Sequence, residues 1–213
     1  MTADRSALLA LSGSLPTTAR MHELAAVHEL VIAADGAASA VVAAGLRVDV
    51  VIGDLDSIGH SRDTLDEAGV TVVEEPSQET GDFEKALVWL RESGVQRVTV
   101  IGFDGGMLDH ALNNASVLAR HAPHFILDVV SGNAVARCTT ATYSFECPRD
   151  GRVSLIPLPS ARLTTTGLEW ELSDQTLAIG VRDGCSNRAT GSTVSVDVHE
   201  GTVLVVHYPH GIE

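Results

Sequence analysis

One stretch carries the strongest signal for the fold and the site, namely Val48-Asp49-Val50-Val51-Ile52-Gly53-Asp54-Leu55-Asp56-Ser57. Its β-branched run, Val50 to Ile52, predicts a short buried strand. Asp54 and Asp56 follow that strand two residues apart, so in an extended segment their side chains point the same way. Two carboxylates aimed at one point repel each other unless a cation lies between them, and Mg²⁺ held partly by substrate phosphates is the usual one. The same letters are also typical of a polar turn or a helix N-cap, so the motif alone leaves both interpretations open.

Composition limits the class of protein. The chain has 213 residues, 45% of them hydrophobic, which is enough for one good core or two small ones. We find no apolar run of membrane-spanning length and no signal-peptide pattern, so we expect a soluble, cytoplasmic protein. The formal net charge of −14 argues against a nucleic acid or an anionic membrane as partner. The three cysteines form no CxxC pair and are odd in number, which predicts buried free thiols rather than disulfides.

Two kinds of pattern follow one another along the chain. Up to about residue 130, strand-like runs alternate with helical ones, which indicates a mostly parallel sheet with helices on its faces. The predicted strands cover residues 7–11, 30–34, 50–52, 70–74, 97–102 and 125–130, and the predicted helices cover 20–28, 37–44, 61–68, 82–92 and 109–120.

After about residue 134, helical periodicity disappears and short alternating segments predict antiparallel strands. They cover residues 141–146, 151–156, 163–166, 176–181, 193–198 and 202–207. We therefore expect an α/β protein with a Rossmann-like, mostly parallel domain over residues 1–135 and a small antiparallel β-sandwich domain over residues 136–213.

Acidic turns gather where a ligand would bind. Ligands of open parallel sheets lie outside the carboxyl ends of the strands. Four acidic turns fall there, namely Asp35-Gly36, Asp54-Leu55-Asp56, Gly81-Asp82 and residues 102–110. One such loop means little, but four at one edge predict a pocket for a cation and phosphates.

Three further features of these turns have two interpretations each. Lys85, the only lysine of the chain, shares a helix face with Asp82, either in the pocket or as a surface pair. Gly105 and Gly106 would let backbone amides approach a phosphate, or they form an ordinary turn. His110 could act as a base, although a histidine that opens a helix is more often structural.

Several motifs occur in an order that is similar to a known family. In the first domain these are residues 34–37 (ADGA), 53–58 (GDLDSI), 81–87 (GDFEKAL) and 102–114 (GFDGGMLDHALNN). In the second they are residues 154–158 (SLIPL), 166–172 (TGLEWEL) and 185–187 (CSN). Together they resemble the successive motifs of thiamine pyrophosphokinases, from roughly residue 30 to residue 206.

The resemblance implies an enzyme that moves the pyrophosphate group of ATP to the hydroxyl of thiamine, giving thiamine diphosphate and AMP, with Mg²⁺. It also implies a homodimer whose active sites lie between the first domain of one subunit and the second domain of the other. By motif position, Asp54, Asp56 and Asp82 would bind Mg²⁺ and orient the triphosphate. Asp109 would complete the catalytic set as a metal ligand or as a base, and the base could be Asp82 instead.

The remaining motif positions concern binding. The resemblance implies that Asp35 and Gly36 line the nucleotide pocket, and that Lys85 contacts phosphate. In the second domain, Trp170 would stack on the thiamine pyrimidine, and Ser186 and Asn187 would form hydrogen bonds with it. From the residues alone, Trp170 could equally belong to the core, and Ser186-Asn187 could be an ordinary turn.

Two positions depart from the family pattern. Met107 stands where the family commonly has an arginine, and Gly81 where it often has threonine. Arg182 or Arg188 could replace the missing arginine from the second domain. Two other functions therefore stay open, namely an Mg²⁺-dependent nucleotide hydrolase or phosphotransferase acting on another metabolite, and a non-catalytic sensor of thiamine or nucleotide.

Overall fold

The computed structural model describes residues 5–53, 69–75 and 79–209. Asp54, Asp56 and the predicted helix over residues 61–68 lie outside the described residues. The chain divides into two units, Met1–Val117 and Leu118–Glu213, which we describe separately. The predicted domain boundary between residues 135 and 136 stays a prediction.

The first unit contains a parallel sheet. Its strands are β1 (Ser6–Ala10), β2 (Leu30–Ala34), β3 (Val50–Gly53), β4 (Thr71–Glu74) and β5 (Arg97–Ile101), in the spatial order β4-β3-β2-β1-β5. All four pairings are parallel, and the register places Ala7 beside Leu30 on one side and Val98 on the other. Nearly continuous burial of β1, β2 and β3 explains why these runs are apolar without alternation. The predicted parallel sheet is confirmed.

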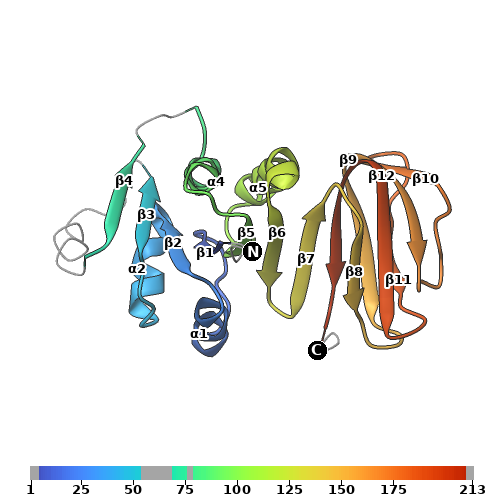
Figure 1. Cartoon of the computed structure of the whole chain (residues 1–213), viewed down its shortest axis with the longest axis horizontal. Helices are drawn as coiled ribbons and strands as arrows, with labels where there is room; N and C mark the ends of the chain where they lie inside the picture. Colours follow the sequence, from blue (N-terminus) through green and yellow to red (C-terminus); the bar gives the residue numbers. More distant parts are fainter. Residues whose placement is uncertain (1–4, 54–68, 76–78, 210–213) are drawn as a thin grey trace. The chain divides into compact units, whose positions relative to one another are not determined.

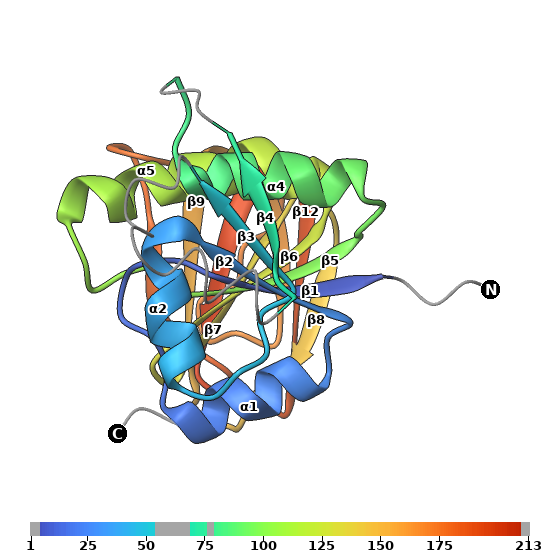
Figure 2. The same cartoon turned by 90° about the vertical axis from the view of Figure 1, so that its left-hand side faces the viewer.

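Helices cover both faces of this sheet. They are α1 (Thr18–Ala26), α2 (Asp35–Ala43), α4 (Asp82–Glu92) and α5 (Leu108–His121). Helices α1 and α2 lie on one face, and α4 and α5 lie on the other (Figure 1, Figure 2). The change of face occurs between the neighbouring strands β1 and β5, which is where open α/β sheets bind ligands.

The second unit is antiparallel. Its strands are β6 (Ile126–Ser131), β7 (Ala134–Thr139), β8 (Tyr143–Glu146), β9 (Arg152–Thr166), β10 (Gln175–Ala178), β11 (Gly184–Arg188) and β12 (Thr193–His207), preceded by a short 3₁₀ turn, η2 (Ala122–His124). They follow the order β10-β9-β12-β7-β6, and in addition β11 pairs with β9 and β8 pairs with β12. One core of side chains from β8, β9 and β12 holds the strands together, including Phe145, Leu155, Leu163 and Val205. The antiparallel second part of the predicted fold is therefore confirmed.

The prediction of many short strands here was wrong in one respect. Segments 151–156 and 163–166 belong to the single strand β9, and segments 193–198 and 202–207 belong to β12. The pairing of β12 with β9 shifts register between Val198 and Glu200 and again between Gly201 and Val203. Such irregularities bend a strand without ending it. Strands β7 and β11 have no counterpart among the predicted segments.

The cysteines follow the prediction in part. All three are free, and Cys138 and Cys147 are buried. Burial raises the pKa of the Cys138 thiol to about 12, so this thiol stays protonated and unreactive at neutral pH. Cys185 is exposed, so its predicted burial was wrong. It lies where β11 changes register against β9, between Gly184 and Asn187. Within the described residues, no helix is long and apolar enough to cross a membrane.

We predict that Gly102→Ala destabilises the protein far more than Gly94→Ala. Both glycines have a positive φ, +69° and +77°, which disfavours alanine by about 1–2 kcal/mol. A Cβ at Gly102 would also lie 2.1 Å from the carbonyl oxygen of Leu11, whereas nothing lies within 4 Å of one at Gly94. Urea unfolding should therefore show an additional loss of about 1–3 kcal/mol for Gly102→Ala. Equal losses for the two variants would contradict the close approach of the two loops.

Candidate functional site

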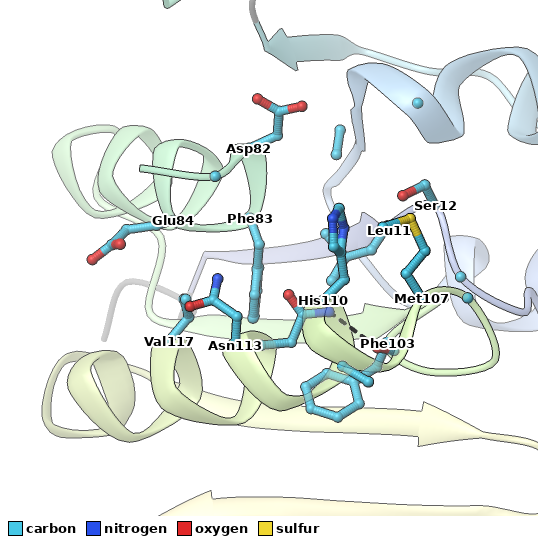
Figure 3. Close-up of a pocket in the computed structure, with 18 of the residues that line it drawn as sticks. Leu11, Ser12, Asp82, Phe83, Glu84, Phe103, Met107, His110, Asn113 and Val117 are labelled. Atoms are coloured by element: carbon cyan, nitrogen blue, oxygen red, sulfur yellow. Dashed lines mark hydrogen bonds between the residues drawn. The ribbon is translucent and has the colours of Figure 1, made fainter. Parts of the chain in front are cut away.

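A pocket of about 670 Å³ opens at the carboxyl edge of the first sheet. The loops after β1, β2 and β5 and the first turns of α4 and α5 line it. Figure 3 shows Ser12 from the first of these loops, Asp82 from α4, and His110 and Asn113 from α5 around this space. The pocket therefore lies where the topology of the sheet predicts a ligand site.

Two of the loops that line the pocket, those after β1 and β5, are joined through their backbones. The amides of Gly13 and Ser14 donate to the carbonyl oxygens of Gly102 and Asp104, with N···O distances of 2.9 and 2.6 Å. A Cβ at Gly13 would lie 2.2 Å from the carbonyl oxygen of Asp104. Only glycine permits this approach, so the sequence Ser12-Gly13-Ser14 holds the loop after β5 in place.

Two predicted acidic residues meet at the end of β3. A Cβ on Gly53 would lie 2.5 Å from the Cβ of Asp35 and 3.2 Å from Oδ2 of Asp82. Asp35 is only 4% exposed, between pocket-lining Ala34 and Gly36, whereas Asp82 lines the pocket directly. Gly53 is also the residue that immediately precedes Asp54 in the sequence. The structure thus brings Asp35 and Asp82 to the point where the Asp54-Leu55-Asp56 motif begins.

No complete metal-binding cluster appears among the residues that the structure describes. No group of three or more histidine, cysteine, aspartate or glutamate side chains there has suitable geometry. Asp54 and Asp56, two of the three predicted Mg²⁺ ligands, are not among those residues. The metal assignment therefore stays a prediction.

Lys85 is buried beside this acidic group. Its side chain is 4% exposed, and its Nζ lies 3.1 Å from Oδ1 of Asp82, one turn earlier on α4. Both residues line the pocket, so the pair is not an ordinary surface pair. A buried ammonium is stable only when it is paired and hydrogen-bonded, which Asp82 provides. The arrangement places a positive charge in the pocket wall, where it can face an anionic ligand.

The start of α5 contributes a third wall. Asp109 is exposed toward the pocket, and its Oδ1 accepts a hydrogen bond from the amide of His110, with an N···O distance of 3.0 Å. Asn114 donates from Nδ2 to the carbonyl oxygen of Phe103 over 3.0 Å, which connects the helix to the loop that precedes it. Met107 also lines the pocket and is 61% exposed. An uncharged side chain therefore occupies the position at which the family commonly has an arginine.

The two glycines of the loop differ in their surroundings. Gly106 lines the pocket, whereas Gly105 is not among the described lining residues. A Cβ on Gly105 would lie 1.9 Å from Oγ of Ser14, and its φ is +78°. Gly105 therefore serves the packing of the two loops.

Sequence patterns alone did not identify part of this lining. Ser12, Gly13, Phe103 and Asn113 all face the pocket, but we did not predict them as site residues. For Ser12 and Gly13 the signal was their position directly after a predicted strand, at the same edge as the acidic turns. Their loop carries no charged residue, so no acidic turn marks it in the sequence.

In the second unit, Trp170 is 58% exposed, so it is not a core residue. The guanidinium of Arg188 lies 5.9 Å from the centre of the indole ring, and its Nε donates to Oε2 of Glu169 over 2.7 Å. Arg182 donates to Oε1 of Gln175 over 2.8 Å. Both arginines that could replace the one missing at Met107 thus have partners within their own unit.

Ser186 and Asn187 differ in accessibility. Ser186 is exposed and has a positive φ of +62°, and its amide donates to Oγ of Ser154 over 3.0 Å. Asn187 is only 7% exposed. Its amide oxygen accepts from the backbone N–H of Trp170 and of Arg188, and its Nδ2 donates to the carbonyl oxygen of Trp170. Ser186 is therefore the more accessible of the two residues to a ligand.

Comparison with protein families gives two matches in the order of the two units. The family described as "Thiamin pyrophosphokinase, catalytic domain" matches residues 21–127, and "Thiamin pyrophosphokinase, vitamin B1 binding domain" matches residues 142–203. Thiamine pyrophosphokinase 1 of Arabidopsis thaliana is 30% identical over 232 residues, which cover 92% of this chain and 84% of the relative. Thiamine pyrophosphokinase 1 of Oryza sativa subsp. japonica is 29% identical and covers 70% of this chain and 62% of the relative.

Solved structures agree at the level of the fold. Thiamine pyrophosphokinase from Bacillus subtilis superimposes with a TM-score of 0.80 at 20% identity, covering 97% of this chain and all of the other. The enzyme from Candida albicans gives a TM-score of 0.83 at 16% identity, covering 96% and 89%. The catalytic-domain family matches about half of the chain, and the A. thaliana relative matches nearly all of it. The chain belongs to the thiamine pyrophosphokinase family.

Proposed function

We propose that this protein transfers the pyrophosphate group of ATP to the hydroxyl of thiamine, giving thiamine diphosphate and AMP. The observation that supports this most directly is the pocket of the first unit, which Asp82 and Lys85 line at the end of β3, with Asp35 buried beside Gly53. Pyrophosphoryl transfer needs positioning and charge stabilisation more than covalent catalysis, and a rigid charged pocket provides both.

The donor set fits Mg²⁺. Asp82 offers carboxylate oxygens in the pocket, Asp35 lies beside it, and Asp54 and Asp56 follow Gly53 in the sequence. Hard divalent cations prefer such oxygen ligands. We propose Asp54, Asp56 and Asp82 as the residues that hold Mg²⁺, which would neutralise phosphate charge during transfer.

The chain's own groups would act around the triphosphate. Lys85 would contact a phosphate, and Asp35 and Gly36 would line the nucleotide pocket beside it. Gly106 would let a backbone amide approach the phosphates, with Gly105 shaping the loop. Asp109, exposed in the pocket, would take the proton of the thiamine hydroxyl or bind the metal.

We propose that thiamine binds through the second domain. Trp170 is an exposed aromatic surface on which a cationic ring system can stack. Ser186 presents an exposed hydroxyl in the segment after Cys185. Cytoplasmic localisation stays a prediction.

The reaction can be tested by analysing the products of purified protein with ATP and Mg²⁺, with and without thiamine. The proposal predicts AMP and thiamine diphosphate in equal amounts, formed only when thiamine is present. Phosphate release that is indifferent to thiamine would support the hydrolase alternative. Saturable binding of thiamine or ATP without turnover would support the sensor alternative, which Met107 at the arginine position suggests.

We expect Asp109→Asn to lower kcat by about 10²–10⁴, because the variant loses a group that binds or deprotonates at the reacting centre. The side chain is exposed, so the thermal midpoint of unfolding should stay close to that of the wild type. The matched control is Asp104→Asn, five residues earlier in the loop that precedes α5 and absent from the described pocket lining. Wild-type turnover by Asp109→Asn, or an equal loss in the control, would contradict the assignment of Asp109.

We also propose that the enzyme is a homodimer whose two domains contribute to different active sites, as the resemblance implies. Co-expression of Asp109→Asn and Trp170→Ala subunits with different tags tests this arrangement. In a mixed dimer, one site would then contain both substitutions and the other neither. Random pairing should therefore restore about a quarter of the wild-type activity. If each site lies within a single subunit, mixing will restore none.

A further inference from the structure

Asn187 is hydrogen-bonded to the residue that is proposed to hold thiamine. Its amide oxygen lies 3.2 Å from the backbone nitrogen of Trp170, and its Nδ2 lies 2.8 Å from the carbonyl oxygen of the same residue. The oxygen also accepts from the backbone nitrogen of Arg188 over 2.8 Å. One side chain thus satisfies both peptide groups of Trp170.

These contacts use most of the hydrogen-bonding capacity of the Asn187 side chain. An amide oxygen has two lone pairs, and both face backbone donors here, of Trp170 and of Arg188. Rotating the amide by 180° would turn its NH₂ group toward those two N–H groups, so the network fixes the orientation. Asn187 is also only 7% exposed. A ligand could reach the amide oxygen only by displacing protein hydrogen bonds, and the second N–H of Nδ2 is the one remaining donor of this buried side chain.

The position of Asn187 completes a short antiparallel pairing. The amide of Glu169 donates to the carbonyl oxygen of Arg188, and the amide of Thr190 donates to that of Gly167, both over 2.9 Å. This backbone pairing stops before Trp170. The side-chain amide of Asn187 has the same donor and acceptor as a peptide group, so it extends the pairing by one residue.

The surrounding turn is anchored at both ends, whereas its tip is exposed. Leu168 and Leu172 are 3% and 6% exposed in the core of the second unit, and Trp170 between them is 58% exposed. At the ring itself, the guanidinium of Arg188 lies 5.9 Å from the centre of the indole. The contacts from Asn187 restrict the backbone that carries it.

We propose that Asn187 is a positioning residue, whose buried amide clamps the backbone of Trp170 and holds the indole ready for thiamine, and that it does not bind thiamine itself. This inference rests on the proposed function, because it takes Trp170 as the thiamine-binding surface. A ring that is already ordered loses less conformational freedom when the ligand binds, so the clamp should act on thiamine affinity.

The test uses the full-length enzyme with Trp89→Phe, which leaves Trp170 as the only tryptophan. In this background, time-resolved fluorescence anisotropy of Trp170 is measured without substrate, and KM and kcat are measured for thiamine and for ATP. For Asn187→Ala we expect faster and wider motion of Trp170 and a rise of about fivefold to tenfold in KM for thiamine. KM for ATP should change less than twofold, on the order of experimental scatter.

Two further variants separate positioning from simple destabilisation. Asn187→Asp keeps the acceptor for the N–H groups of Trp170 and Arg188, but it turns an oxygen instead of a donor toward the carbonyl oxygen of Trp170, so the motion of Trp170 and KM for thiamine should both rise above the wild-type values. Thr165→Ala removes a buried hydrogen bond from the same turn, in which Oγ1 accepts from the amide of Leu172 over 2.8 Å. Thr165→Ala should lower stability and leave the motion of Trp170 at the wild-type level.

Three outcomes would overturn the clamp. Weaker thiamine binding with unchanged motion of Trp170 in Asn187→Ala and Asn187→Asp would identify Asn187 as a direct ligand. Greater motion of Trp170 with an unchanged KM for thiamine would show that the clamp does not affect thiamine binding.

If the wild type does not convert thiamine, the proposed function fails. The anisotropy of Trp170 still tests the clamp in that case, and unchanged anisotropy in both Asn187 variants overturns it.

Discussion

The close approach of Asp35 and Asp82 to the backbone of Gly53 is the constraint on which the first unit depends. Any side chain at Gly53 would collide with Asp35, so the end of β3 must be glycine. Two carboxylates at such a point are unfavourable unless positive charge compensates them. Lys85, buried and 3.1 Å from Asp82, supplies part of that charge. Mg²⁺ bound together with a nucleotide would supply further positive charge at this point, which is why we propose that complex as the ligand of the pocket.

In the second unit, the main constraint is that the large indole ring of Trp170 is exposed to solvent. Aromatic residues make up only 4% of the chain, and one of its two tryptophans is exposed. The turn that carries Trp170 is anchored by Leu168 and Leu172 and is connected to β11 by Asn187. Fixing the backbone rather than the ring leaves the indole accessible. In both units, therefore, the residues proposed to contact substrate depend on buried neighbours for their position.

Much of the fold could be predicted from the sequence, because in elements such as α4 the periodicity of the apolar residues matches the face that is buried in the structure. Helix α4 has the predicted limits, Asp82 to Glu92, since its apolar residues recur every three or four positions and Gly94 follows it. The pairing of Asp82 with Lys85 followed from the same periodicity. The long strands β9 and β12 were not predicted, because the prolines of β9 and Gly201 were interpreted as breaks. In the structure they lie in strands that bend and shift register, and sequence does not distinguish a bulge from an end.

Among the residues that line the pocket, charge marked Asp82, Lys85 and Asp109 in the sequence. Ser12 and Gly13 line the pocket through loop geometry, and nothing in their own chemistry identifies them. The partners of Asn187 depend on the pairing of residues 167–170 with residues 187–190, which only the folded structure reveals. A motif therefore predicted that Asn187 belongs near the site, but its contacts had to be observed.

Calorimetric titration of ATP into the protein in Mg²⁺ and, in parallel, in EDTA tests most directly whether the acidic pocket binds a metal–nucleotide complex. Free ATP is highly anionic, and the pocket offers it several carboxylates and one lysine that is already paired. Binding should therefore weaken by at least about a hundredfold without the metal, as like charges at short range repel strongly in a partly buried site. Equal affinity in the two buffers would contradict the account, because the acidic pocket would then not be the place where a metal–nucleotide complex binds.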